Sequence, residues 1–100
     1  MTEYKLFIDG QWIAEPQQEY FPAINPFTQE AFARVPQAPE AQVKQAIDAA
    51  RRAFQTTWGK TSGVERARLL NRLADLLHEN ADRMGILEST DNCKGIRESR

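Results

Sequence analysis

Residues 62–77 read SGVERARLLNRLADLL, and this stretch decides how the second half of the chain folds. Ser62 and Glu65 have the spacing of a capping box, in which each side chain satisfies a free amide at the start of a helix. The apolar residues behind them recur at helical spacing and make an unusually wide face: Leu69, Leu70, Leu73, Ala74, Leu76 and Leu77. We therefore predict a helix that is buried on more than one side.

Two further helices are predicted, one on each side of this stretch. The earlier one has a single apolar stripe, made of Val43, Ala46, Ile47, Ala50 and Phe54. Pro39 suits its first turn, where a missing N–H costs nothing. The later and shorter helix runs from about Asp82 to Thr90. Residues 56–61 are predicted to be a loop, and residues 96–100 are predicted to begin another helix.

The first 36 residues are typical of strands and turns. Leu6–Ile8 and Gln11–Ile13 flank Asp9-Gly10, a pair that favours the type I′ turn of a hairpin because glycine tolerates a positive φ. Tyr20–Ile24 and Ala31–Val35 are predicted to form a second hairpin. Two hairpins are too little to be stable alone in water, so they require further packing partners.

The predicted fold class is α/β, with β-hairpins over residues 1–36 followed by three α-helices over residues 38–100. One hundred residues make one small domain or a piece of a larger one, and no second domain is expected. The last residues begin a helix without completing it, whereas a free-standing domain usually ends after a completed element. The sequence therefore predicts an incomplete domain.

Composition excludes several classes of function. The net charge is -1 and the basic residues are spread along the chain, which argues against nucleic acid or an anionic membrane as a partner. The single cysteine cannot form an internal disulfide or a structural zinc site, which favours a reducing compartment. No run of about 20 apolar residues is present, and residues 1–5 lack the features of a secretory signal. The expected location is the cytoplasm.

Five strings in this order resemble the N-terminal segment of the aldehyde dehydrogenase superfamily, from about residue 6 to residue 100. They are Phe7-Ile8-Asp9-Gly10-Gln11-Trp12, Ile24-Asn25-Pro26-Phe27-Thr28, residues 46–54 together with Trp58, residues 65–75, and Glu88-Ser89-Thr90-Asp91-Asn92. Each string alone is weak, but five at sensible spacing are specific.

The resemblance implies a parent enzyme that oxidises an aldehyde to a carboxylic acid with NAD or NADP. In that family a cysteine thiolate attacks the aldehyde, hydride passes to the nicotinamide, and a glutamate-activated water hydrolyses the thioester. The residues that perform these steps lie beyond the equivalent of Arg100. No catalytic or cofactor-binding residue is therefore predicted here, and the chain alone is expected to be inactive and to bind no cofactor. Its expected partner is the rest of the dehydrogenase domain, and the parent is expected to be a homo-oligomer.

Cys93 is a tempting nucleophile because Lys94 beside it could favour a thiolate. No histidine or carboxylate pair around it forms an evident nucleophile-and-base set, however, and the family's nucleophile lies in a different motif. The family has glycine at this position and proline at that of Gly95, so Cys93 is interpreted as a substitution at a helix-ending position. A left-handed conformation there costs a residue with a Cβ roughly 1 kcal/mol or more. Asn92 or Gly95 is expected to have taken over that conformation.

Asp91 is the predicted metal ligand. The resemblance places it at a monovalent-cation site that also uses the backbone carbonyls of Ala23 and Ile24, and oxygen ligands suit hard cations. The alternative is that Asp91 caps a turn or pairs with an arginine.

The remaining chemistry-bearing residues are interpreted as structural. His78 is expected on a helix surface or in packing, and Trp12 and Trp58 are expected to pack the hairpin and the loop. Arg66, Arg68 and Arg72 lie near Glu65 and Asp75, which indicates an ion-paired helix face. A second hypothesis for the whole chain is a small interaction or structural protein without enzymatic activity, whose leucine-rich helix binds a partner.

Overall fold

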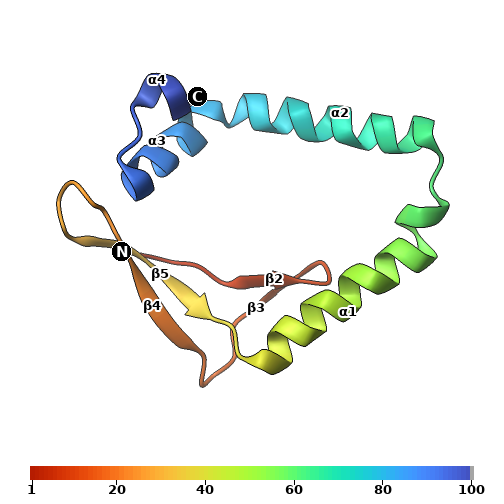
Figure 1. Ribbon diagram of the computed structural model, residues 1–100, viewed down its shortest axis with the longest axis horizontal. Helices are drawn as coiled ribbons and strands as arrows, with labels where there is room; N and C mark the ends of the chain where they lie inside the picture. Colours follow the sequence, from red (N-terminus) through yellow and green to blue (C-terminus); the bar gives the residue numbers. More distant parts are fainter. Residues whose placement is uncertain (100) are drawn as a thin grey trace. The chain divides into compact units, whose positions relative to one another are not determined.

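The computed structural model describes residues 1–99, and Arg100 lies outside the described part. Strands come first and helices follow, as the sequence predicts for a mixed α/β fold (Figure 1). The strands are β1 Thr2–Glu3, β2 Leu6–Ile8, β3 Gln11–Ile13, β4 Glu19–Ile24 and β5 Ala31–Gln37. The helices are α1 Glu40–Thr56, the 3₁₀ helix η1 Trp58–Lys60, α2 Gly63–Glu79, α3 Ala81–Asn92 and α4 Ile96–Ser99.

The chain divides into two compact units. The first unit consists of residues 1–23 and 32–61. The second consists of residues 24–31 and the described part of residues 62–100. The boundary therefore crosses the last residue of β4 and the first residue of β5, so that the β4–β5 connection belongs to the second unit, and it passes again between η1 and α2.

The β2–β3 hairpin of the first unit has the predicted turn. Its two strands are antiparallel, with Leu6 opposite Ile13 and Ile8 opposite Gln11. The two turn residues both have positive φ, 54° for Asp9 and 75° for Gly10, as a type I′ turn requires. The Asp-Gly prediction is confirmed.

The two faces of this hairpin have different environments because side chains alternate along a strand. Ile8 is buried, with 7% of its surface exposed. Phe7 and Trp12 are largely exposed, and their ring centroids lie 4.8 Å apart. Four alanines of α1, at positions 46, 49, 50 and 53, line a shallow hollow together with residues 7–10, so small side chains allow the hairpin to approach the helix. The hairpin's buried side therefore lies against α1.

An ion pair also joins this hairpin to α1. The guanidinium of Arg52 donates a hydrogen bond of 2.7 Å to the Asp9 carboxylate. Both side chains are more than half exposed, so the pair is worth no more than about 1 kcal/mol. Apolar packing of Ile8 is the stronger of the two contributions.

The other strands form a three-stranded sheet in the order β1-β5-β4. The predicted pairing of the strands around Tyr20–Ile24 and Ala31–Val35 is confirmed, and β1 is an additional strand that the sequence did not predict. β1 pairs with β5 in parallel, with Thr2 opposite Ala33 and Glu3 opposite Arg34. Ala33 is completely buried in this sheet. A strand of two residues shows no alternation in the sequence, and its pairing partner is some thirty positions away by this register, so only the three-dimensional structure reveals it.

Arg34 connects the strands of this sheet through its side chain. Its guanidinium carbon lies 4.4 Å from the centroid of the Tyr20 ring, and its terminal nitrogen lies 3.5 Å from the Glu3 carboxylate. Desolvation raises the pKa of the Tyr20 hydroxyl, with further contributions from the charge and hydrogen bond of Glu3. The cluster thus holds β1 against β5 by polar contacts as well as by the ladder.

Pro39 lies just outside α1 and not in its first turn. It is the N-cap residue, with φ -70° and ψ 165°, and its carbonyl accepts hydrogen bonds from the amides of Gln42 (3.0 Å) and Val43 (3.1 Å). A proline fits here because its fixed φ suits the extended N-cap geometry and its missing N–H leaves no donor unpaired. The predicted position was wrong by one or two residues.

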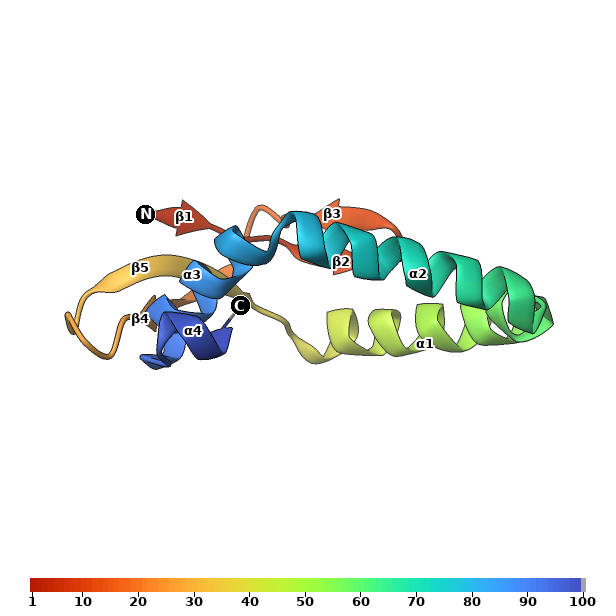
Figure 2. The ribbon, with the colours of Figure 1, turned by 90° about the horizontal axis from the view of Figure 1, so that it is seen from above.

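In the second unit, α2 begins where the capping pattern predicts. The Ser62 hydroxyl accepts a hydrogen bond of 3.1 Å from the Glu65 amide. The carboxylate of Glu65 accepts a hydrogen bond of 3.0 Å from Arg68, and this bond holds the pKa of the Glu65 carboxyl below its ordinary value. Both long helices, α1 and α2, contain 17 residues and are continuous along their length (Figure 2).

The prediction that α2 is buried on more than one side is wrong for this chain. Its leucines are each at least 40% exposed: Leu69, Leu70, Leu73, Leu76 and Leu77. Ile8 and Ala33 are the buried hydrophobic residues among residues 1–99. The chain therefore contains little hydrophobic core, and the wide face of α2 lacks the apolar partners that its pattern predicts.

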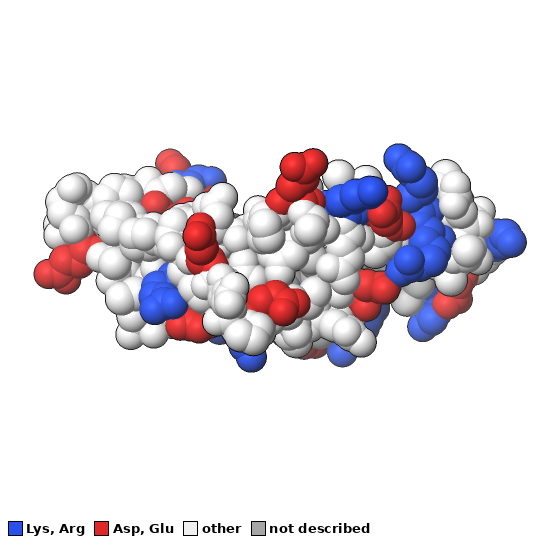
Figure 3. Space-filling view, turned by 90° about the horizontal axis from the view of Figure 1, so that it is seen from below, with Lys and Arg blue, Asp and Glu red and all other residues white. Residues whose placement is uncertain are grey.

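Charged side chains of both signs are spread over the molecular face in Figure 3, in agreement with the balanced composition. Over residues 1–99, no helix has the length and apolar character that crossing a membrane requires.

Candidate functional site

The end of α3 contains the residues that the sequence singles out. α3 spans Ala81–Asn92, slightly longer than predicted at both ends, and Cys93–Gly95 connect it to α4. A hydrogen bond of 3.0 Å between the hydroxyls of Ser89 and Ser99 links the two helices. These elements all belong to the second unit.

Cys93 itself adopts the left-handed conformation that ends α3. Its φ is 61° and its ψ is 16°, and its amide donates a hydrogen bond of 2.9 Å to the Ser89 carbonyl. The prediction that Asn92 or Gly95 had taken over this conformation is wrong, because the C-cap position falls on Cys93. Asn92 instead accepts a hydrogen bond of 2.9 Å from the Lys94 amide through its side-chain oxygen.

Replacing Cys93 with glycine is expected to raise the free energy of unfolding by up to about 1 kcal/mol. Glycine adopts positive φ without the steric cost that a Cβ imposes, although its greater freedom in the unfolded chain offsets part of the gain. The measurement is the midpoint of guanidinium-induced unfolding, followed by circular dichroism. Cys93→Ala is the control, since alanine removes the thiol but keeps the Cβ. If Cys93→Gly unfolded at a lower guanidinium concentration than the parent chain, the left-handed conformation of Cys93 would not be strained.

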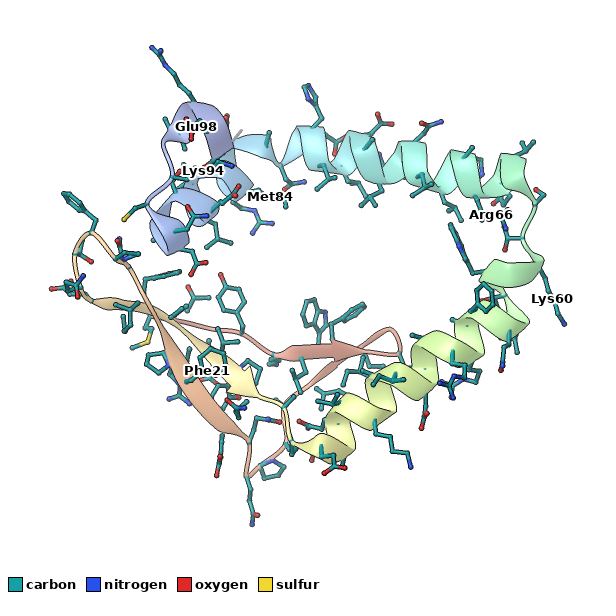
Figure 4. The ribbon with its side chains drawn as sticks, viewed as in Figure 1. Phe21, Lys60, Arg66, Met84, Lys94 and Glu98 are labelled. Atoms are coloured by element: carbon teal, nitrogen blue, oxygen red, sulfur yellow. The ribbon has the colours of Figure 1, made fainter. Side chains whose placement is uncertain are left out.

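Cys93 borders a hollow of about 350 Å³ on the second unit. The other lining residues are Asn25, Phe27, Ile86, Ser89, Thr90, Lys94 and Ile96. They include neither an imidazole nor a carboxylate, so the hollow supplies no general base for the thiol. The ammonium of Lys94 lies 3.7 Å from the Glu88 carboxylate. Lys94 is labelled in Figure 4. The geometry offers an exposed thiol without the partners of an activated nucleophile.

Asn25 organises the turn that contributes Phe27 to this hollow. Its side-chain oxygen accepts hydrogen bonds from the amides of Phe27 (2.9 Å) and Thr28 (3.4 Å), and its carbonyl accepts one from Gln29 (2.8 Å). An asparagine at the start of a turn is the signal from which this role can be recognised in a sequence. The role of Asn25 in this turn was not predicted, although the residue is part of one of the family strings.

The three predicted cation ligands lie on different elements. Ala23 and Ile24 are the last two residues of β4, half-buried and exposed respectively, and Asp91 is exposed in the last turn of α3. Ala23 belongs to the first unit, whereas Ile24 and Asp91 belong to the second. Asp91 forms no ion pair with any of residues 1–99, and that same range contains no metal-binding group of three His, Cys, Asp or Glu side chains. The cation site stays a prediction.

The residues interpreted as structural lie on surfaces. His78 is exposed in the last turn of α2. Trp12 packs against Phe7 on the hairpin, as expected. Arg68 pairs with Glu65, the Arg72 guanidinium lies 3.8 Å from the Glu79 carboxylate, and Asp75 forms no ion pair with any of residues 1–99. The ion-paired helix face is therefore present, with one partner different from the prediction.

Comparison with known proteins identifies what the chain is similar to. A model described as the aldehyde dehydrogenase family matches residues 12–100. Acetaldehyde dehydrogenase 2 of Cupriavidus necator is 39% identical over 97 residues, which are 97% of this chain and 19% of that protein.

Solved structures give the same result. A crystal structure of aldehyde dehydrogenase from Bartonella henselae superposes with a TM-score of 0.91 at 26% identity, covering 99% of this chain and 21% of that one. A betaine aldehyde dehydrogenase point mutant from Staphylococcus aureus, solved with NAD⁺, superposes with a TM-score of 0.88 at 30% identity, covering 95% and 19%. The chain spans about a fifth of the length of the relatives that it matches.

Proposed function

Since the chain belongs to the aldehyde dehydrogenase family, we propose that it is the N-terminal part of an enzyme that oxidises an aldehyde to a carboxylic acid with NAD or NADP. It contributes scaffold to that enzyme and no catalytic residue. The observation that carries the family is the match over residues 12–100, and the small share of each relative that the chain covers indicates that it is only a part of the enzyme. The whole of residues 1–100 then forms one piece of a single dehydrogenase domain.

The scarcity of buried hydrophobic residues supports this assignment. Twenty-one large hydrophobic side chains are substantially exposed in the described part of the chain, including those of α2, Phe54 of α1 and Phe27 of the turn. Apolar surface of this extent indicates a contact region, because stable single domains bury most of theirs. In the proposed parent enzyme, the remaining polypeptide of the same domain covers these side chains.

The described residues do not fit a dinucleotide. A dinucleotide site of the Rossmann kind needs a parallel sheet whose first strand leads through a glycine-rich turn into a helix. The parallel pairing recorded within residues 1–99 is that of β1 with β5, which joins two residues of each strand. α1 follows Pro39 and α2 follows Ser62, so neither long helix begins after such a turn. Cofactor binding in the parent enzyme is therefore assigned to residues outside this chain.

The purified chain is expected to show no NAD⁺- or NADP⁺-dependent oxidation of acetaldehyde or betaine aldehyde. The physical reason is that the described hollow beside Cys93 lacks a base and that no dinucleotide site accompanies it. Absorbance of the reduced nicotinamide at a fixed wavelength measures turnover. Acetaldehyde dehydrogenase 2 of Cupriavidus necator, assayed in parallel, is the positive control. Any turnover by the purified chain would contradict the assignment of the catalytic residues to the rest of the enzyme. This holds whether or not the Cys93→Ala substitution abolishes that turnover.

A further inference from the structure

Three glutamines of the first unit form a chain of hydrogen bonds at the start of α1. The Gln18 side-chain nitrogen donates to the Gln37 carbonyl (2.7 Å), and the Gln42 nitrogen donates to the Gln18 side-chain oxygen (3.0 Å). A backbone carbonyl only accepts, so it fixes the orientation of the Gln18 amide, which in turn fixes that of Gln42. The Gln42 side-chain oxygen is therefore the last group in this series of hydrogen bonds, and it is buried without a partner.

Gln42 lies in the wall of a pocket of about 640 Å³. Only 8% of its surface is exposed. The other lining residues are Glu15, Pro16, Gln17, Gln18, Glu19, Gln37, Ala38 and Pro39. The lining thus contains two carboxylates and no lysine or arginine, and neither Glu15 nor Glu19 forms an ion pair with any of residues 1–99. Unpaired negative charge and an unsatisfied acceptor occur in the same pocket.

We propose that this pocket binds a cation that carries N–H donors, a guanidinium or alkylammonium group. One N–H of the cation satisfies the Gln42 oxygen, and its charge lies near Glu15 and Glu19. The oxygen is covered, so the cation contacts it when the exposed residues Glu15–Gln17 shift while Gln18 keeps its two hydrogen bonds. An anion does not suit the pocket even though it lies at the N-terminus of α1, because two carboxylates and an orphaned acceptor oppose it.

A titration followed by NMR tests the proposal on the full chain. Methylguanidinium chloride is expected to cause saturable shifts at the Gln42 side-chain amide and at the backbone amides of residues 15–19. Tetramethylammonium chloride at the same ionic strength has the charge without N–H donors, and it is expected to cause no saturable shift. Equal responses to the two salts, or no saturation with methylguanidinium, would overturn the proposal.

The double variant Glu15→Gln, Glu19→Gln is expected to bind methylguanidinium about tenfold more weakly, since it loses two exposed charge contacts. Both side chains are exposed, so the fold is retained. Glu30→Gln, in the second unit, is the matched control and leaves the affinity unchanged. An unchanged affinity in the double variant would contradict the site. A short acetylated arginine peptide that binds more tightly than methylguanidinium identifies a basic protein side chain as the ligand, and equal affinity identifies a free small cation.

Discussion

Replacing Gly59 with alanine is expected to lower the free energy of unfolding by about 1–3 kcal/mol, the usual cost of overpacking. Gly59 lies in η1, directly after α1, and a Cβ added there would overlap the backbone carbonyl oxygen of Phe54. That oxygen belongs to the last turn of α1 and moves only with the backbone, so the strain cannot be relieved by a rotamer change. The φ of Gly59 is not in the left-handed region, so the loss reports the steric clash, offset in part by the smaller conformational freedom of alanine in the unfolded chain.

Gly63→Ala is the matched control for this experiment. Gly63 is the first residue of α2, and no atom lies within 4 Å of a Cβ added there. Alanine restricts the unfolded chain and favours helix, so the control is expected to be neutral or to stabilise by up to about 1 kcal/mol. Guanidinium-induced unfolding, followed by circular dichroism, measures both variants. If the two substitutions had the same effect, the approach of η1 to the Phe54 carbonyl would be absent in solution.

Truncating Ile8 to alanine is expected to destabilise the chain by about 2–3 kcal/mol, at the low end of the range for buried isoleucines. Ile8 is one of the two buried hydrophobic residues among residues 1–99, and it lies on the side of the hairpin that faces the alanine-rich surface of α1. Loss of its side chain removes apolar contact between β2 and α1. The exposed Asp9–Arg52 ion pair between the hairpin and α1 would remain.

Phe7→Ala provides the comparison on the same strand. It removes a larger side chain, but Phe7 is 60% exposed and packs mainly on Trp12, so the expected loss is below about 1.5 kcal/mol. Unfolding midpoints and size-exclusion profiles of both variants should be measured together, since exposed apolar surface also promotes association. A larger loss for Phe7→Ala than for Ile8→Ala would mean that the hairpin packs on its opposite face.

Local chemistry explains which parts of the fold were predictable. The Asp9-Gly10 turn and the Ser62 cap depend on residues within a few positions of one another, and both are present as the sequence indicates. Pro39 was placed with a small error, because a helix end shifts by a residue or two without changing the pattern. The helix end at Cys93 was predicted correctly, but its left-handed conformation was assigned to Asn92 or Gly95. The parallel pairing of β1 with β5 was not predicted, since two residues of strand have no signal of their own.

The site was less predictable than the fold. The strings that indicate the family contain Asn25, Asp91 and Asn92, and the sequence could not assign a contact to any of them. The structure shows that Asn25 and Asn92 organise turns, whereas the role of Asp91 as a cation ligand stays a prediction. The unpartnered oxygen of Gln42 was also missed, because it results from three glutamines that lie 19 and 24 positions apart.

The sequence by itself determined the family, the order of strands and helices, and the lack of an evident nucleophile-and-base set around Cys93. Each of these depends on residue types and short spacings that can be read along the chain. Only the tertiary structure decided that Cys93 holds the left-handed position, that the α2 leucines remain exposed and that the Gln42 oxygen lacks a donor. These outcomes depend on contacts between residues that are distant in the sequence. Burial and hydrogen bonding are set by such contacts and not by the type of any single residue.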